Sequence, residues 1–356
     1  MINSTLIGAA IIGCGWAGQR HAAALASQGV SLRWAVDVDL ARAQSIAEAY
    51  PPCRVATSHA QTLDDAGVDV VSLCLPHYLH APVGIAALDA GKHVLVEKPL
   101  AGDLDEADAM ITAAQRADKI LMVAENVRFD PLYLRIQALL AEGVIGRPAL
   151  IQMIRECYLQ RSFLEDRPWF LNEHQAAGGI MMSGGIHDFE TMRLLLGEIE
   201  QVQALRAPQR FLEMEGDDTS VALVRFAGAD GRAGAVATLV ESFLMKNLVT
   251  ASGPEVHTLR IDGELGSIEV RDGRTIHLFS ERADLLPGGE LREHILYVPE
   301  QDTFTVLIAH LLACMADGSE PITSGRRQRR ALEAVCAAYR SMDEGGAPIT
   351  LSAPSG

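Results

Sequence analysis

A chain of 356 residues is too long for one ordinary hydrophobic core, so we expect two domains. Hydrophobic residues make up 49% of the chain and charged residues 21%, which is a globular composition without low complexity. The 30 basic residues are outnumbered by 46 acidic ones, giving a formal net charge of −16. This balance disfavours binding to phosphate backbones, so we expect no nucleic-acid partner.

Cysteine spacing and hydropathy define the expected compartment. No two of the six cysteines form a CxxC pair, which argues against a zinc knuckle or a dithiol redox motif and favours reduced thiols. No apolar stretch approaches the about 20 residues needed to span a bilayer. The start, MINSTLIGAAIIGCG, has no basic region before its apolar run, so we expect no secretory signal. These features predict a cytoplasmic protein with no membrane partner.

Residues 1–126 are predicted to form the first domain. Short β-rich runs alternate there with Ala-rich helical segments, and this alternation predicts βαβ units around a parallel sheet. The expected strands are 6–12, 31–38, 55–57, 68–75, 93–96 and 120–124. The expected helices are 17–28, 40–49, 81–90 and 104–117, the last with Asp103 and Glu106 at capping-box spacing.

Residues 127–356 are predicted to form a second, α+β domain. A helix begins at Pro131 and stops near Gly143, as expected for proline at a first turn and glycine past an end. Strand-like runs joined by turn signals then predict an open, mostly antiparallel sheet. The expected strands are 149–157, 219–226, 234–243, 257–261, 267–270 and 275–280, followed by closing helices at 304–316 and 327–342.

The first strand leads into GCGWAG, in which Gly13, Gly15 and Gly18 have GxGxxG spacing. A strand before and a helix after this loop are the context of a doubly wound, Rossmann-type dinucleotide site, with Trp16 in the loop and Ala17 at the start of the helix. Asp37 ends the next strand, where a carboxylate accepts hydrogen bonds from a ribose 2′-hydroxyl and repels a 2′-phosphate. The pattern favours NAD over NADP. The alternatives are glycines with a purely structural role and an acid, Asp37 or Asp39, that only caps the following helix. Asp39 is the better cap, which leaves Asp37 free.

VLVEKPL is an apolar strand that ends abruptly in Glu97 and Lys98, before Pro99. Ligands of doubly wound sheets bind beyond the carboxyl ends of the strands, which is where these residues are expected. A lysine that is partly desolvated there can have a lowered pKa and a point charge aimed at the reacting oxygen. The alternative is a surface ion pair between Lys98 and Glu97 or another neighbour.

AGGIMMSGGIHDFETM, in the second domain, is a second glycine-rich stretch. Helical spacing places His187 on one face with Glu190 or Thr191. Taken alone, His187 reads more readily as a satisfied core histidine than as a catalyst. The spacing of His174, His187 and Asp188 fits no known type of metal site, so we expect no metal.

Several motifs together resemble the glucose-fructose oxidoreductase and inositol dehydrogenase family (Gfo/Idh/MocA), over nearly the whole chain. The motifs are GCGWAGQRH, PHYLH at 76–80, AGKHVLVEKPL at 90–100, NVRFDP at 126–131 and AGGIMMSGGIHD, and the ending SGRRQRRALEAVCAAYRS matches in rhythm. EKP and GG…GxHD are specific in combination.

The resemblance implies a dinucleotide-binding domain followed by a domain whose open sheet forms oligomer contacts, in a homodimer or homotetramer. It implies that Lys98 lies beside nicotinamide and substrate, that the Lys98–Pro99 bond is cis, and that His187 faces the same point. Arg128 matches a position that contacts substrate. The expected cofactor-binding residues are Gly13, Gly15, Trp16, Ala17, Gly18, Asp37, Leu75, Pro76, His80, Glu97, Lys98 and Asn126.

One position departs from the family pattern. Members commonly have an aspartate four residues before the histidine, and this chain has Ser183. A hydroxyl does not carry charge at neutral pH, but it hydrogen-bonds a substrate hydroxyl, so we expect Ser183 to bind substrate. Glu173, Asp188 and Glu190 are the candidates to supply the missing charge.

The sequence therefore predicts an NAD-dependent oxidoreductase that acts on a secondary alcohol of a sugar, polyol or sugar acid, with Lys98 and His187 as catalytic residues. One alternative is an enzyme that keeps the cofactor bound and uses it cyclically, for sugar disproportionation or glycoside cleavage. Another is a non-catalytic dinucleotide-binding sensor. Scattered arginines, Arg155, Arg161 and Arg167, leave a phosphorylated substrate open.

Overall fold

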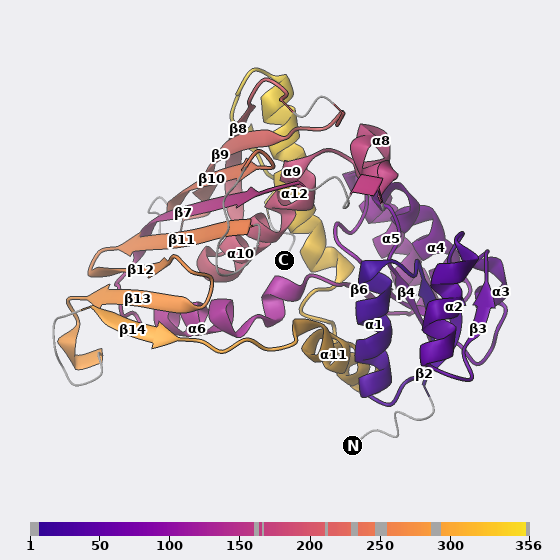
Figure 1. Ribbon diagram of the computed structural model, residues 1–356. Helices are drawn as coiled ribbons and strands as arrows, with labels where there is room; N and C mark the ends of the chain where they lie inside the picture. The colour runs from indigo at the N-terminus through magenta and orange to yellow at the C-terminus, as the bar shows by residue number, and fades with distance from the viewer. Residues whose placement is uncertain are drawn as a thin grey trace. The chain divides into compact units, whose positions relative to one another are not determined.

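The computed structural model describes residues 7–159, 164–165, 167–210, 213–228, 234–245, 255–285 and 293–353. The chain divides into two compact units (Figure 1). The first runs to Asn126 and includes Asp302–Leu332. The second comprises Val127–Gln301 and the chain from Glu333 on.

The first unit is built on a six-stranded sheet with the order β3-β2-β1-β4-β5-β6, in which every pairing is parallel. This is the Rossmann order, and the direction of winding reverses between β1 and β4. The sequence-based prediction of a doubly wound parallel sheet is confirmed. The strands are β1 (Gly8–Ile12), β2 (Ser31–Val36), β3 (Arg54–Ala56), β4 (Val70–Leu73), β5 (His93–Val96) and β6 (Leu121–Val123).

Helices connect these strands, and their starts follow from local sequence. They are α1 (Trp16–Ser27), α2 (Leu40–Ala49), α3 (Ala60–Leu63), η2 (His77–Leu79), α4 (His80–Asp89) and α5 (Leu104–Ala117). The Asp103 side chain accepts a hydrogen bond from the Glu106 amide at 2.8 Å and so caps α5 as predicted. The Glu106 carboxylate in turn accepts from the Gly102 amide, one residue before the capping position. The predicted capping box is thus present in a shifted form.

Two late helices, α11 (Thr303–Asp317) and α12 (Gly325–Asp343), follow the second sheet in sequence. The structure differs here from the division at residues 1–126 and 127–356, because Asp302–Leu332 group with the first unit. The reason is apolar packing: the Phe304 ring lies 6.0 Å from the Trp16 ring and 5.5 Å from the His21 ring, both on α1. In addition, the Val123 amide of β6 donates to the Thr323 carbonyl at 2.9 Å.

The second unit is built on a nine-stranded sheet with the order β14-β13-β12-β11-β7-β10-β9-β8-β15. Within this sheet, β7 and β10 form the only parallel pair among the described strands, so the predicted mostly antiparallel sheet is confirmed. Strands β8, β14 and β15 were not predicted from the sequence. The strands are β7 (Pro148–Cys157), β8 (Ile199–Arg206), β9 (Thr219–Phe226), β10 (Val236–Ser242), β11 (Glu255–Gly263), β12 (Gly266–Val270), β13 (Thr275–Ser280), β14 (His294–Tyr297) and β15 (Ile349–Thr350).

The two faces of this sheet differ. Helix α10 (Gly185–Leu196) packs on β7 and β10, and α6 (Pro131–Ala141) packs on α10, so one face is covered within the unit. The other face carries exposed apolar side chains, because residues along β9 alternate strictly between buried and exposed. The remaining short elements are η3 (Asn126–Phe129), η4 (Pro168–Leu171), α8 (Glu173–Ala176), α9 (Ile180–Ser183) and η5 (Ala283–Leu285).

Within the part of the chain that the structure describes, no helix has the length and apolar character needed to cross a membrane.

Candidate functional site

The glycine loop after β1 has the packing expected of a dinucleotide site. A Cβ on Gly13, whose φ is +92°, would lie 2.1 Å from the Cys74 carbonyl oxygen, and one on Gly18 would lie 2.0 Å from the Gly13 carbonyl oxygen. A Cβ on Gly15 would meet only the Arg42 Nη1 at 3.9 Å. The first and third glycines are therefore required by close packing, while the second faces open space. This distribution leaves room for a pyrophosphate to approach the backbone at Gly15.

Helix α1 begins directly after this loop. Its N-cap, Gly15, makes no side-chain capping hydrogen bond, and no acidic residue lies in the first turn. The first amides of the helix are therefore oriented toward the loop without a competing carboxylate, and the positive end of the helix dipole favours an anion there. The residues present fit the pyrophosphate of a dinucleotide.

Asp37 follows β2 and contacts the glycine loop. One carboxylate oxygen accepts from the Cys14 amide at 2.7 Å and the other from the Asp39 amide at 2.9 Å. Asp39 is the residue that caps α2, accepting from the Ala41 amide at 3.0 Å, as predicted. Each Asp37 oxygen keeps a second lone pair, so the half-buried carboxylate retains acceptor capacity for a ribose hydroxyl.

The charged end of β5 is anchored by a buried histidine on α1. The His21 Nε2 lies 3.0 Å from a Glu97 carboxylate oxygen, and the His21 Nδ1 lies 2.7 Å from the Ser72 hydroxyl. Burial acts to lower the pKa of His21, but Cys74 and Glu97 outweigh it and raise the pKa to about 10. Burial likewise acts to raise the pKa of Glu97, yet the His21 partner holds it below its usual range. The pair is therefore charged at neutral pH.

Lys98 follows this pair at the carboxyl edge of the sheet. Its side chain is half-buried, its amide donates to the second Glu97 oxygen at 3.1 Å, and the Lys98–Pro99 peptide is cis. The carboxyl ends of β1 and β4, where the winding reverses, meet the same edge. Lys98 thus lies on the edge of the sheet where ligands of this fold bind.

His80 joins two loops at this edge. It is fully buried, and its two ring nitrogens lie 2.8 Å from the Pro99 carbonyl and 2.8 Å from the Leu75 carbonyl. Burial is the main influence on the ring and lowers the pKa of His80. These contacts support an indirect role for His80, which positions the Leu75–Pro76 loop, rather than direct contact with the cofactor. Asn126, also in the first unit, donates to the Thr303 hydroxyl at 3.3 Å.

In the second unit, the glycine-rich segment is held by Asp217 and Tyr339. The Asp217 carboxylate accepts from the Gly179 amide at 3.0 Å, from the Met181 amide at 3.3 Å and from the Tyr339 hydroxyl at 2.7 Å. A Cβ on Gly179 would lie 2.0 Å from the Asp217 carbonyl oxygen, and one on Gly178 would lie 2.2 Å from the Tyr339 hydroxyl. The glycines are required here by the close approach of these groups.

The acid that follows His187 is committed to internal partners. Asp188 is fully buried and accepts two hydrogen bonds from Arg155, at 2.9 and 2.8 Å, while the His257 Nε2 lies 3.1 Å away. Burial opposes ionisation, but Arg155 and His257 hold the pKa of Asp188 well below its usual range. Asp188 therefore does not supply a charge at Ser183, and Arg155 is not an open site for a substrate phosphate.

Glu190 and Glu173 are the other candidates to supply the charge missing at Ser183. Glu190 is buried and forms ion pairs with Arg193 and, at 3.5 Å, with Arg128. Glu173 is exposed on α8, and its amide donates to Glu215. The ion pair with Glu190 orients Arg128, which is expected to contact substrate, and leaves its other donors available for that contact. Arg161 lies outside the described residues.

Ser183 ends α9 and His187 lies in the first turn of α10, and both side chains are half-buried. The Thr191 hydroxyl donates to the His187 carbonyl at 2.9 Å, which confirms that these residues share a face. Among the described residues, no group of three or more His, Cys, Asp or Glu side chains is arranged to hold a metal ion.

No role was predicted from the sequence for His21, Ser72, Asp217 or Tyr339. Only His21 carried a recognisable signal, because a histidine in the otherwise Ala-rich α1 is unusual. The partners of Asp217 are brought together only by the fold, since Asp217 and Tyr339 are separated by 122 positions.

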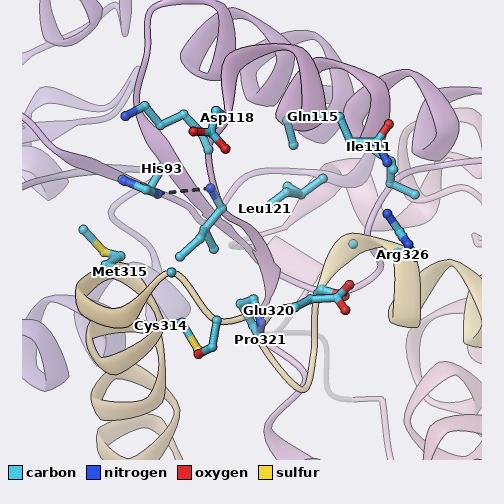
Figure 2. Close-up of a pocket in the computed structure, with 17 residues that line it drawn as sticks. His93, Ile111, Gln115, Asp118, Leu121, Cys314, Met315, Glu320, Pro321 and Arg326 are labelled. Atoms are coloured by element: carbon cyan, nitrogen blue, oxygen red, sulfur yellow. Dashed lines mark hydrogen bonds between the residues drawn. The ribbon is translucent and has the colours of Figure 1, made fainter.

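A separate hollow of about 350 Å³ lies at the opposite, amino edge of the six-stranded sheet (Figure 2). Figure 2 shows that its lining includes apolar Leu121 and Met315 as well as charged Glu320 and Arg326. None of the predicted site residues lines it. Because ligands of doubly wound sheets bind at the carboxyl edge, this hollow is not the candidate active site.

The Rossmann sheet, its glycine loop and Asp37 define a dinucleotide-binding protein. Comparison with protein families identifies the group. The model described as "Oxidoreductase family, NAD-binding Rossmann fold" (GFO_IDH_MocA) matches residues 7–125, and the GFO/IDH/MocA C-terminal domain matches residues 133–269. The chain belongs to the Gfo/Idh/MocA family of oxidoreductases, and its cofactor is NAD. The predictions of the family, of the oxidoreductase class and of NAD are confirmed.

Individual relatives share low sequence identity with this chain, but the aligned regions are long. Myo-inositol 2-dehydrogenase of Thermotoga maritima is 26% identical over 341 residues, which cover 94% of this chain and 96% of the relative. An uncharacterized oxidoreductase of Bacillus subtilis, YrbE, is 28% identical over 221 residues, 61% of this chain and 62% of YrbE, which is less than two thirds of its length. The solved structure of levoglucosan dehydrogenase in complex with NADH and levoglucosan has a TM-score of 0.83 at 20% identity, covering 97% of this chain and 99% of that one.

The glycine loop generates a first prediction. Gly15→Ala should leave the melting temperature nearly unchanged, because the added Cβ meets only a flexible arginine, but should weaken NAD binding at least about tenfold by filling the approach to the pyrophosphate. Gly18→Ala is the contrasting variant, because its Cβ meets backbone at 2.0 Å and should destabilise the fold. Thermal melts and calorimetric NAD titrations measure both. Unchanged NAD affinity in Gly15→Ala would contradict the assigned role.

The His21–Glu97 pair generates a second prediction. The raised pKa of His21 means that its charge stabilises the fold fully below its usual pKa of 6.5 and that this contribution is lost as pH rises toward about 10. The lowered pKa of Glu97 means that its contribution is lost below its usual 4.5. The stability difference between wild type and His21→Gln should therefore be largest between pH 4.5 and 6.5 and shrink toward pH 10. Thermal melts across this range test it, and a pH-independent difference would argue against an ion pair.

Proposed function

We propose that the protein is an NAD-dependent dehydrogenase that oxidises a secondary alcohol of a sugar, polyol or sugar acid, or reduces the corresponding ketone. The relative named myo-inositol 2-dehydrogenase and the structural neighbour solved with levoglucosan support a sugar or polyol substrate. The observation that carries the proposal is Lys98, placed at the ligand edge of the sheet beside a carboxylate already paired with His21. A cytoplasmic location fits six cysteines that form no disulfide with one another.

The first unit supplies the cofactor site in this proposal. The backbone at Gly15 and the first amides of α1 hold the pyrophosphate, and Asp37 accepts from the adenosine ribose. Leu75, Pro76, Glu97 and Asn126 shape the loops at the same edge, with Trp16 and Ala17 opening the helix. When bound, NAD supplies the hydride acceptor for the oxidation.

Lys98 supplies the charge that the reaction needs. Because Glu97 is neutralised by His21, it does not cancel the charge of the neighbouring ammonium. In the proposed reaction Lys98 stabilises the alkoxide that develops on the substrate oxygen, where a fixed positive charge has the greatest effect. His187 orients the same hydroxyl or receives its proton. Ser183 and Arg128 contact the remaining substrate hydroxyls.

The catalytic role of Lys98 predicts that Lys98→Ala lowers turnover by at least about 100-fold, the loss typical of an acid-base group. A panel of inositols, sugars and aldonates assayed for NADH formation, with NADP in parallel, first identifies the substrate. Lys119→Ala, at the opposite edge of the sheet, is the matched control and should retain full activity. Near-complete activity in Lys98→Ala on that substrate would refute the mechanism.

The same assay separates the alternatives. A tightly bound cofactor used cyclically would give product without release of NADH, and a dinucleotide-binding sensor would give no turnover on any member of the panel.

We also propose that the open face of the nine-stranded sheet forms a homo-oligomer, a dimer or tetramer. Leu205, Val221, Val240 and Ile154 are successive partners across β8, β9, β10 and β7. Leu223 on the same face is 52% exposed. A continuous row of apolar side chains on a solvent face is typical of a protein interface.

This interface predicts that Leu223→Asp dissociates the oligomer, because the added carboxylate would have to be buried without a partner. Leu134→Asp on α6, another exposed apolar position, is the control and should leave the assembly intact. Analytical ultracentrifugation at several concentrations distinguishes the species. A wild-type monomer, or an oligomer unaffected by Leu223→Asp, would exclude this face.

A further inference from the structure

Glu241, on β10, is a buried acid to which neither the sequence nor the proposed reaction assigns a role. It is 0% exposed and is the direct register partner of Arg155 on β7, which in turn pairs with His257 on β11. The three side chains thus form one row on the face of the sheet that α10 covers. Asp188, from α10, is inserted above this row.

The Glu241 carboxyl also supports the start of α10. A Cβ on Gly184, the N-cap, would lie 2.7 Å from one carboxyl oxygen, and a Cβ on Gly185 would lie 3.7 Å from the other. The acid therefore packs directly against the backbone that leads from Ser183 to His187. Any change in its size or charge acts on the first turn of the helix.

The hydrogen bonding of Glu241 indicates its protonation state. Both carboxyl oxygens are buried without a hydrogen-bond partner of good geometry among the described residues, and the Arg155 Nε is 3.9 Å away. An ionised carboxylate in that environment would lack donors and would be strongly unfavourable. A protonated carboxyl can instead donate its proton to the neighbouring Asp188. In agreement, burial and the Asp188 charge raise the pKa of Glu241 well above its usual value, against the opposing effect of Arg155.

We propose that Glu241 is a positioning residue for His187, and that it acts as a neutral acid that fills the space beneath Gly184 and Gly185 and shares its proton with Asp188. The role of His187 in this inference rests on the proposed function, whereas the contacts of Glu241 do not depend on it. The charged or titratable groups that face this pair are Arg155 and Cys157 of β7 and His257 of β11, whose Nδ1 lies 3.2 Å from the Tyr133 hydroxyl of α6.

Two substitutions separate shape from charge. Glu241→Gln keeps the size and a donor toward Asp188, so turnover should stay within about threefold of wild type. Glu241→Ala removes the support beneath the first turn of α10, and displacement of His187 should lower kcat about 10- to 100-fold with a smaller change in KM. Equal losses in both variants would show that the ionisable proton itself is needed, and full activity in Glu241→Ala would show that no positioning occurs. Either result overturns the proposal.

Stability as a function of pH tests the protonation state without using activity. The pKa of Glu241 is raised in the folded protein, so as pH rises the Glu241 carboxyl ionises in the unfolded chain before it ionises in the folded one. Wild type therefore loses stability as pH rises above 4.5, the usual pKa of a glutamate. Glu241→Gln cannot ionise, so its melting temperature relative to wild type should increase steadily between about pH 5 and 8.

Glu269→Gln on β12 is the matched control. The hydrogen bond from Arg271 lowers the pKa of Glu269, so this variant should be no more stable than wild type above pH 4.5 and should show no upward trend. A flat difference for Glu241→Gln would show that Glu241 is ionised in the folded protein and would overturn the proposal.

The two proposals fail in different ways. If wild type turns over no polyol with NAD, the proposed function fails, and the pH trend together with the imidazole NMR signals of His187 in Glu241→Ala still decides the positioning role. If the dehydrogenase is active but the pH trend is absent, only the role of Glu241 is refuted.

Discussion

The structure of the candidate site depends on the buried ion pair between His21 and Glu97. A charged residue at the end of a core strand is costly unless it is paired and hydrogen-bonded. Here the imidazole of α1 meets the carboxylate at 3.0 Å and the Ser72 hydroxyl at 2.7 Å, so three elements that meet at one edge are joined. The same helix begins at the glycine loop. The pair therefore ties the proposed pyrophosphate site to the Glu97-Lys98 end of β5, so that the lysine beside the proposed cofactor has a fixed backbone.

The second unit uses the same physical device around its glycine-rich segment. Asp217 collects the amides of Gly179 and Met181, and Arg155 neutralises Asp188 directly after His187. In both units, buried groups that form ion pairs or hydrogen bonds hold the backbone in place. The side chains of Lys98, Ser183 and His187 are not among these buried groups and are half-buried. This division of labour is expected of a site whose reacting groups must be held rigidly by residues that do not react.

Much of the fold could be predicted because its signals are local. Apolar runs separated by Ala-rich helices predict the parallel sheet. The glycine spacing and the helix caps at Asp39 and Asp103 are likewise predicted from a few neighbouring residues. What failed depends on distant partners. Strand β8, with the sequence IEQVQALR, resembles a helix or a loop until β9 pairs with it, and α11 was assigned to the wrong unit because only its packing on α1 reveals its place. The three acids proposed to replace the family aspartate were equivalent in sequence, and only the structure shows that Asp188 and Glu190 are already engaged.

We propose that Lys98 and His187 act on one substrate oxygen beside the nicotinamide. A crystal structure of the enzyme with NAD and the polyol identified by the activity panel tests this most directly. We expect the Lys98 ammonium and the His187 imidazole both to lie within about 3.2 Å of the same hydroxyl oxygen. The nicotinamide ring should lie against the carbon that bears this hydroxyl. A complex in which that oxygen contacts neither side chain, or in which the nicotinamide lies away from the carboxyl end of β5, would contradict it.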